Sequence, residues 1–128
     1  MKITALVARV LLGIIFLVFG LNGFLHFIPQ QPMPAGLAAQ FLDVLTVSHY
    51  SVFVFLIQVI CGILFLVGRL VPLALLLIAP VIVNILLFHA LMAPSGILPG
   101  FLATLLWIIV AFSVRSAFAG IFQSNAHG

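Results

Sequence analysis

The chain has 128 residues, of which 66% are hydrophobic and only 4% are charged, and its mean hydropathy is +1.54. No water-facing surface of a soluble domain can be assembled from this composition, so the sequence predicts an integral membrane protein. The formal net charge of +3 comes from four cations and one acid, Asp43. These cations are spaced as signals that orient membrane helices and not as a nucleic-acid footprint, which excludes a nucleic-acid partner.

Long, continuous apolar runs predict a single all-α domain over residues 1–128, built as a four-transmembrane-helix bundle. The expected spans cover about residues 4–28, 50–67, 71–92 and 98–115. A hydrocarbon core of ~30 Å requires roughly 20 helical residues at 1.5 Å each, and the four runs approach that length. Membrane lipids are therefore expected to surround most of the chain.

Glycines on the first two spans are the candidates for helix packing. Gly13 and Gly20 are seven residues apart on one helical face, and Gly62 lies in the second span. Missing side chains let a neighbouring helix approach closely. Asn22 and His26 are spaced i and i+4, so they share a different face that lies roughly opposite Gly13.

A short amphipathic helix is expected at about residues 34–47, between the first and second spans. Gln40 and Asp43 are three residues apart among apolar neighbours, which is typical of a helix that lies in the membrane interface. Together with His49, these residues are candidates for a lid. The alternative is a plain connector with one solvated face.

The second and third spans are expected to form an antiparallel hairpin. Gly68 is a suitable left-handed residue after a helix, and Pro72 is placed to open the next one. Within the third span Pro80 lacks an N–H group, which is expected to kink the helix and free a carbonyl. Asn84 and His89 are five residues apart, about 140° around an ideal helix, so they point in different directions.

With four spans, all the lysines and arginines fall on one side of the membrane. The positive-inside rule makes that side cytoplasmic. The expected location is the inner (cytoplasmic) membrane, as a multi-pass protein whose N- and C-termini are both cytoplasmic. The cations are Lys2, Arg9, Arg69 and Arg115.

Polar residues from all four spans fall in the outer half of this arrangement. Unpaired amides and imidazoles in hydrocarbon cost several kcal/mol, so these residues are expected to meet in a polar cavity that opens outward. The indole N–H of Trp107 is expected to find a partner such as Gln58 or Asn84. The alternative is that the histidines are hydrated at the interface and the amides only join helices. The candidate ligand-binding residues are Asn22, His26, Gln58, Asn84, His89 and Trp107.

No catalytic residues are identified, which favours a chain that is not an enzyme on its own. The lone Asp43 excludes a pair of catalytic carboxylates, and Cys61, the only cysteine, excludes an intrachain disulfide. A metal site from His26, His49 and His89 is chemically possible, but each residue comes from a separate segment and the spacing does not support it. A quinone fits an apolar pocket with amide and imidazole partners better.

Three sequence features resemble the DoxX-like family of small four-helix membrane proteins. They are Arg9-x3-Gly13-x2-Phe16-x3-Gly20, then Gly62-x5-Gly68-Arg69, and the histidine His89 that closes the third span. The resemblance implies partners of redox systems, including subunits associated with quinone-linked oxidases and thiosulfate oxidation. Members commonly carry a glutamate in the second span, where this chain has Gln58. They often carry a lysine at the end of the first span, where this chain has Asn22 or Gly23. These departures weigh against proton-coupled chemistry.

Three functional hypotheses follow. The leading one is an accessory subunit of a membrane redox complex that binds a quinone through Asn22, His26, Asn84 and His89. The second is a small carrier or lipid-handling protein that uses the same outward cavity. The third is a structural subunit, in which the Gly13 and Gly20 face joins redox partner proteins or a homo-oligomer.

Overall fold

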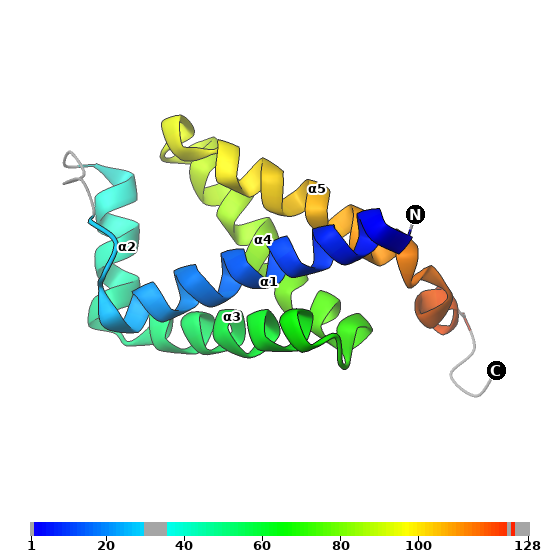
Figure 1. Ribbon diagram of the computed structural model, residues 1–128. Helices are drawn as coiled ribbons and strands as arrows, with labels where there is room; N and C mark the ends of the chain where they lie inside the picture. Colours follow the sequence, from blue (N-terminus) through cyan, green and yellow to red (C-terminus); the bar gives the residue numbers. More distant parts are fainter. Residues whose placement is uncertain (1, 30–35, 123, 125–128) are drawn as a thin grey trace.

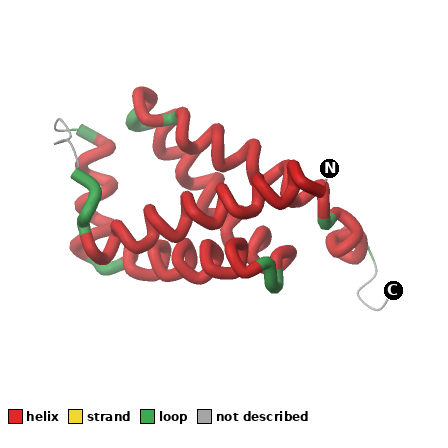
Figure 2. The backbone as a smooth tube through the Cα atoms, in the orientation of Figure 1, coloured by secondary structure: helices red, strands yellow, loops and turns green. Residues whose placement is uncertain are grey.

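The computed structural model describes residues 2–29, 36–122 and 124, and within these residues it contains helices and no strand. The expected all-helical fold is confirmed. Residues 34 and 35, at the start of the expected amphipathic helix, lie outside the described residues. The helices are α1 (Lys2–Leu25), α2 (Leu37–Val47), α3 (Tyr50–Val67), α4 (Val71–Leu91) and α5 (Leu98–Ser113), with short 3₁₀ helices η1 (Pro94–Gly96) and η2 (Arg115–Phe122) (Figures 1 and 2).

Three helices, α1, α3 and α4, are each long and apolar enough to cross a membrane. Helix α5 has 16 residues and reaches this standard only together with η2, from which it is bent by 86°. The described residues therefore contain three candidate spans, or four if the bent pair is one span. Both counts describe a multi-pass helical membrane protein.

The four long helices pack as a ring around one core. Helix α1 contacts α3 and α5, while α4 contacts the same two helices from the other side. Each of the four contributes side chains that are fully buried. Because lipid tails are as apolar as leucine, this core gains its stability from close packing more than from removal of water. The largest of these buried side chains are Phe16, Phe65, Leu12, Leu75, Ile78 and Val110.

Glycines let α1 and α3 approach to backbone contact, and this is the most extensive helix pair in the bundle. A Cβ atom added to Gly62 would lie 2.6 Å from the backbone nitrogen of Leu17. A Cβ atom added to Gly13 would lie 3.0 Å from the carbonyl oxygen of Gly62. Gly13, Gly20 and Gly62 are all buried, so these glycines pack helices within one chain.

The turn between α3 and α4 is the expected tight hairpin. Gly68 has φ of 73°, and its N–H donates to the carbonyl of Leu64 at 2.9 Å. This geometry confirms the left-handed residue predicted after the helix. Leu70 is also left-handed, and Pro72 lies in the first turn of α4, where its missing N–H has no helical partner to lose.

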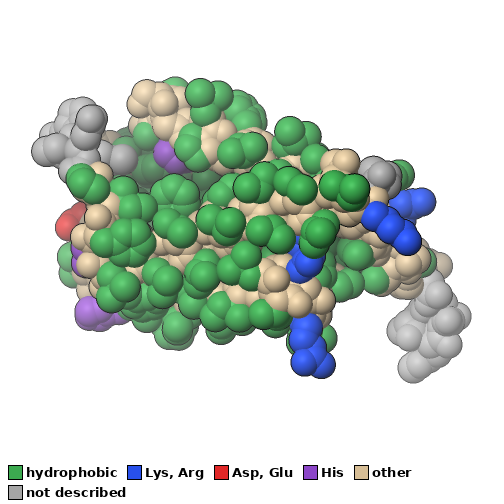
Figure 3. All heavy atoms as spheres, in the orientation of Figure 1, with side chains coloured by type: hydrophobic (Ala, Val, Ile, Leu, Met, Phe, Trp, Pro, Cys, Tyr) green, Lys and Arg blue, Asp and Glu red, His purple; other side chains and the backbone are tan. Residues whose placement is uncertain are grey.

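The two ends of the bundle differ in charge. The start of α1, the α3–α4 hairpin and η2 lie at one end (Figure 1), where the lysine and arginine side chains gather (Figure 3). We call this the cationic end; it carries Lys2, Arg9, Arg69 and Arg115. The opposite end, which we call the histidine end, carries Asp43, His26, His49 and His89 around α2 and the α4–α5 turn. Hydrophobic side chains cover the surface between the two ends (Figure 3).

Candidate functional site

Asn22 is part of the turn that ends α1. Its side-chain Oδ1 accepts a hydrogen bond from the backbone N–H of Ile28 at 2.7 Å, and its carbonyl accepts one from the N–H of His26 at 2.8 Å. Asn22 is buried, whereas His26 is exposed and left-handed, with φ of 52°. The amide oxygen that was expected to meet a ligand therefore satisfies a backbone donor beyond the helix end.

Gln58 is buried where α3 packs against α1. A Cβ atom added to Gly20 would lie 3.0 Å from the Cβ of Gln58, so the base of this side chain lies against the glycine. Its exposed fraction is only 6%. Among the described residues, no hydrogen bond joins Gln58 to Asn22, the other buried amide of the predicted site.

Asn84 lies on the outside of the bundle and not in its interior. Its neighbours Val81 and Ile82 are buried, but Asn84 itself is exposed. Its Nδ2 donates to the carbonyl of Pro80 at 2.8 Å, one turn back along the same helix. One N–H of the amide is therefore bonded within α4 and not to another helix. Helix α4 continues past Pro80 to Leu91 without interruption.

His89 joins the end of α4 to the following turn. Its Nδ1–H donates to the carbonyl of Ala93 at 3.1 Å. The ring also lies close to Gly96, where an added Cβ would be 2.8 Å from the imidazole Cε1. His89 is partly buried on the side of α4 that carries the buried Ile82, while Asn84 is exposed. The predicted angular separation of Asn84 and His89 is thus confirmed.

Trp107 of α5 donates its indole N–H to the carbonyl of Leu75 in α4 at 3.0 Å. The expectation that Gln58 or Asn84 would be its partner is wrong. The accepting carbonyl is one residue before Leu76, whose helical donor is removed by Pro80. The bond joins two neighbouring helices of the ring.

Helix α2 runs across the histidine end of α1 and α3 (Figure 1). It has no buried residue, and the three lid candidates Gln40, Asp43 and His49 are all exposed. It reaches α4 through an aromatic pair, in which the rings of Phe41 and Phe88 stack with centroids 5.5 Å apart. The lid role of α2 stays a prediction.

The histidines are held on three different elements. His26 follows α1, His49 precedes α3 and His89 lies in the last turn of α4. In the part of the chain that the structure describes, no group of three His, Cys, Asp or Glu side chains is placed to hold a metal ion. The three candidate histidines are therefore not arranged as a metal site in the described residues.

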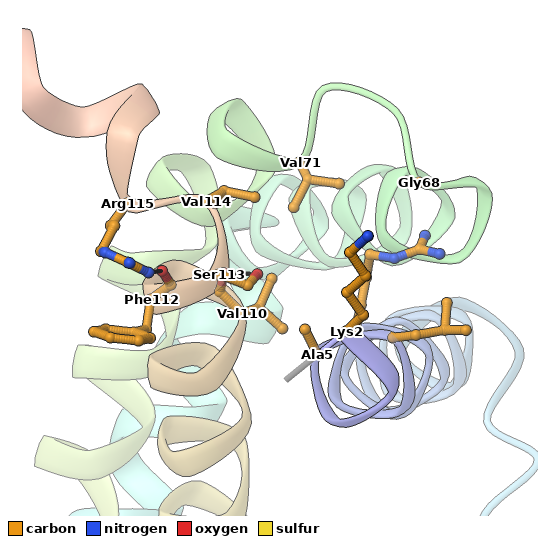
Figure 4. A pocket seen from close by; sticks show the side chains of 11 residues that line it. Lys2, Ala5, Gly68, Val71, Val110, Phe112, Ser113, Val114 and Arg115 are labelled. Carbon is orange, nitrogen blue, oxygen red and sulfur yellow. Dashed lines mark hydrogen bonds between the residues drawn. The ribbon is translucent and has the colours of Figure 1, made fainter.

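A pocket of about 560 Å³ opens at the cationic end, opposite to the predicted cavity (Figure 4). Helix α1, the α3–α4 hairpin and the end of α5 form its walls. This pocket is not predicted in the sequence analysis, because there the cations serve only to orient the helices. The sequence signal for it is that all four cations fall on the same side of the membrane. The lining residues are Lys2, Ala5, Leu6, Arg9, Gly68, Val71, Val110, Phe112, Ser113, Val114 and Arg115.

A comparison with protein families shows which family the chain belongs to. The family model described as DoxX matches residues 4–90, more than half of the chain. The chain belongs to the DoxX family. The resemblance predicted from the sequence is confirmed. No curated protein and no solved structure matches the chain. The DoxX match covers α1 to nearly the end of α4 and leaves α5, with Trp107, outside it.

In this DoxX chain, several of the residues that carry the family resemblance build the contact between α1 and α3. The Nη1 of Arg9 donates to the carbonyl of Phe65, in the last turn of α3. Gly68 leaves room for that guanidinium, since an added Cβ would be 2.6 Å from Nη1. Gly13 and Gly62 form the backbone contact described above. The DoxX pattern therefore specifies how the first two long helices pack.

Proposed function

We propose that this DoxX-family protein is a non-catalytic accessory subunit of a membrane-bound, quinone-linked redox complex. The supporting observation is that its polar membrane side chains bond to the chain's own backbone. Asn22, Asn84 and Trp107 each do so. The lone thiol, Cys61, is buried and cannot form an intrachain redox couple. Redox chemistry would therefore come from a partner, of the kind that the family resemblance implies.

The proposal assigns the quinone to the partner enzyme. The four residues expected to hold a quinone lie in different environments, since Asn22 is buried and hydrogen-bonded while Asn84 is exposed. His89 is engaged by Ala93. A ring-bearing ligand needs a few polar groups that converge on one pocket, and the exposure of Asn84 argues against such a pocket.

Helix α2 is the proposed contact with the partner. It exposes apolar side chains as well as polar ones: Leu37 is 68% exposed and Val47 is 70% exposed. Gln40 and Asp43 are exposed on the same helix. A helix with both kinds of side chain uncovered fits a boundary between lipid, water and a second protein.

The proposed orientation follows from the cations. Because the positive-inside rule places lysine and arginine in the cytoplasm, the cationic end is assigned to the cytoplasmic face of the inner membrane. In a Cys61→Ala background, Ser48→Cys in spheroplasts should react with a membrane-impermeant maleimide. Ser116→Cys should react only after lysis. The reverse pattern would show that the orientation is wrong.

The accessory role can be tested in native membranes. Membranes with the wild-type chain, without it, and with Gln40→Arg/Asp43→Arg are compared for quinol-dependent electron transfer. The tagged chain is also purified in mild detergent and examined for a haem or flavin spectrum. Activity of the double variant should fall to that of membranes lacking the chain, because the contact surface is altered.

Arg69→Gln is the matched control, since it changes a charge at the opposite end and should leave activity and co-purification intact. Unchanged electron transfer in membranes lacking the chain, with no chromophore on the purified protein, would contradict the accessory role.

A further inference from the structure

The pocket at the cationic end collects positive charge, and no acidic side chain of the described residues lines it. Lys2, Arg9 and Arg115 all line it. The sequence contains one acidic side chain, Asp43, and it lies on α2 at the histidine end. Three cations around one partly apolar pocket repel each other, and an anion bound among them would relieve this repulsion.

Two of the cations are held in place by the backbone. Arg115 donates to the carbonyl of Phe112 at 2.8 Å, and its guanidinium carbon lies 4.2 Å from the centroid of the Phe112 ring. Arg9 uses Nη1 for its bonds to α3. A guanidinium has five N–H donors, so Nε and Nη2 of Arg9 retain donors for an oxyanion.

The pocket lies between the cationic side chains and apolar side chains on the lipid-facing surface. Lys2 and Arg115 lie on opposite sides of it, with Val110 and Ser113 between them (Figure 4). Two lining residues are also half exposed, Leu6 at 50% and Phe112 at 53%. A ligand with an anionic head and hydrocarbon chains can therefore place the head among the cations and its chains along these side chains.

We propose that this pocket binds the phosphate headgroup of an anionic glycerophospholipid. Phosphate is the group that arginine and lysine recognise together, and basic pockets between membrane helices bind such headgroups. The pocket volume of about 560 Å³ lies within the range of small-ligand sites. Lipid bound there would join α1, the hairpin and the start of η2, which meet at this end.

The test measures lipid retention by the purified full-length protein with native mass spectrometry. Phosphatidylglycerol and cardiolipin are compared with phosphatidylcholine for the wild type, Lys2→Gln, Arg115→Gln and Arg69→Gln. Removing one pocket cation should weaken anionic lipid binding roughly five-fold. Arg69 is at the same end but does not line the pocket, so Arg69→Gln should bind as the wild type does.

Arg115→Lys should restore most of the binding lost in Arg115→Gln, which separates charge from any change in fold. Equal loss in Arg69→Gln would overturn the proposal, because it would mean a diffuse surface attraction. Equal retention of phosphatidylcholine would also overturn it. Displacement of the lipid by inorganic phosphate alone would show a free-anion site and reject the lipid.

Discussion

The two ends of this bundle use their polar side chains differently. At the histidine end, Asn22 and His89 bond to backbone groups of the turns that follow α1 and α4. At the cationic end, Arg9 does the same for α3, but Lys2 and Arg115 add charge around an open pocket. A polar residue near the end of a membrane helix is thus first a partner for the backbone. Such a residue is a candidate for a binding site only when its charge is not fully used in hydrogen bonds to the backbone.

Gly62→Ala should be the most damaging of the single substitutions considered. The new methyl group would meet the backbone of Leu17, which cannot rotate away, so we expect a loss of about 3 kcal/mol in the free energy of unfolding. At the histidine end, a Cβ atom added to Gly23 would overlap the ring of Phe55, a side chain that can turn where a backbone cannot, so Gly23→Ala should cost less, about 2 kcal/mol. Detergent unfolding, followed by the fluorescence of the single tryptophan, Trp107, measures both. Equal losses would mean that the α1–α3 contact is uniform along its length.

Arg9→Met should remove the charged cap of α3. The carbonyl of Phe65 would lose its side-chain donor within the membrane boundary, and we expect a loss of about 2 kcal/mol. Arg69→Met, at the same end, is exposed and should change stability by about 0.5 kcal/mol or less. The same unfolding measurement applies. A large effect of both variants would indicate that net charge, and not the cap, stabilises this end.

Asn22→Leu and Asn84→Leu should differ in how much they lower the free energy of unfolding. Replacing the buried Asn22 leaves the N–H of Ile28 without its acceptor and should cost about 1.5 kcal/mol. Replacing Asn84, which is exposed and bonds within its own helix, should change stability by about 0.5 kcal/mol or less. Thermal unfolding in detergent provides the comparison. A larger loss from Asn84→Leu would place that amide in an interaction that only an assembled form of the protein contains.

His89→Leu should have the smallest measurable effect, about 1 kcal/mol, because it removes one hydrogen bond to Ala93. His49→Asn serves as the control, since His49 is exposed and asparagine tolerates its left-handed backbone with φ of 64°. The control should retain wild-type stability. A loss in the control of the same size would give His49 a role that its exposure does not predict.

Much of the fold could be predicted from local chemistry. The hairpin followed from Gly68 and Pro72, because one residue allows a left-handed turn and the other suits the first turn of a helix. The difference in direction between Asn84 and His89 followed from helix geometry alone. These features depend on neighbours in sequence, so the sequence was sufficient.

The choice of polar partners could not be predicted in the same way. The amide of Asn84 can bond within α4 or across to another helix, and the spacing permits both. The indole of Trp107 bonds to the backbone carbonyl of Leu75. Because every residue has such a carbonyl, the sequence does not indicate which one accepts the bond. The pocket is lined by α1, by the α3–α4 hairpin and by Arg115, which follows the 86° bend after α5, so it is formed by segments far apart in the sequence. Such features are decided by tertiary packing.

The cap that Arg9 forms on α3 has a consequence for how the protein is made. Synthesis proceeds from the N-terminus, so α1 reaches the membrane before the carbonyl of Phe65 exists. Until α3 arrives, the guanidinium of Arg9 must remain hydrated at the membrane surface, because its burial without a partner is costly. We therefore expect α1 and α3 to be the first pair of helices that can assemble.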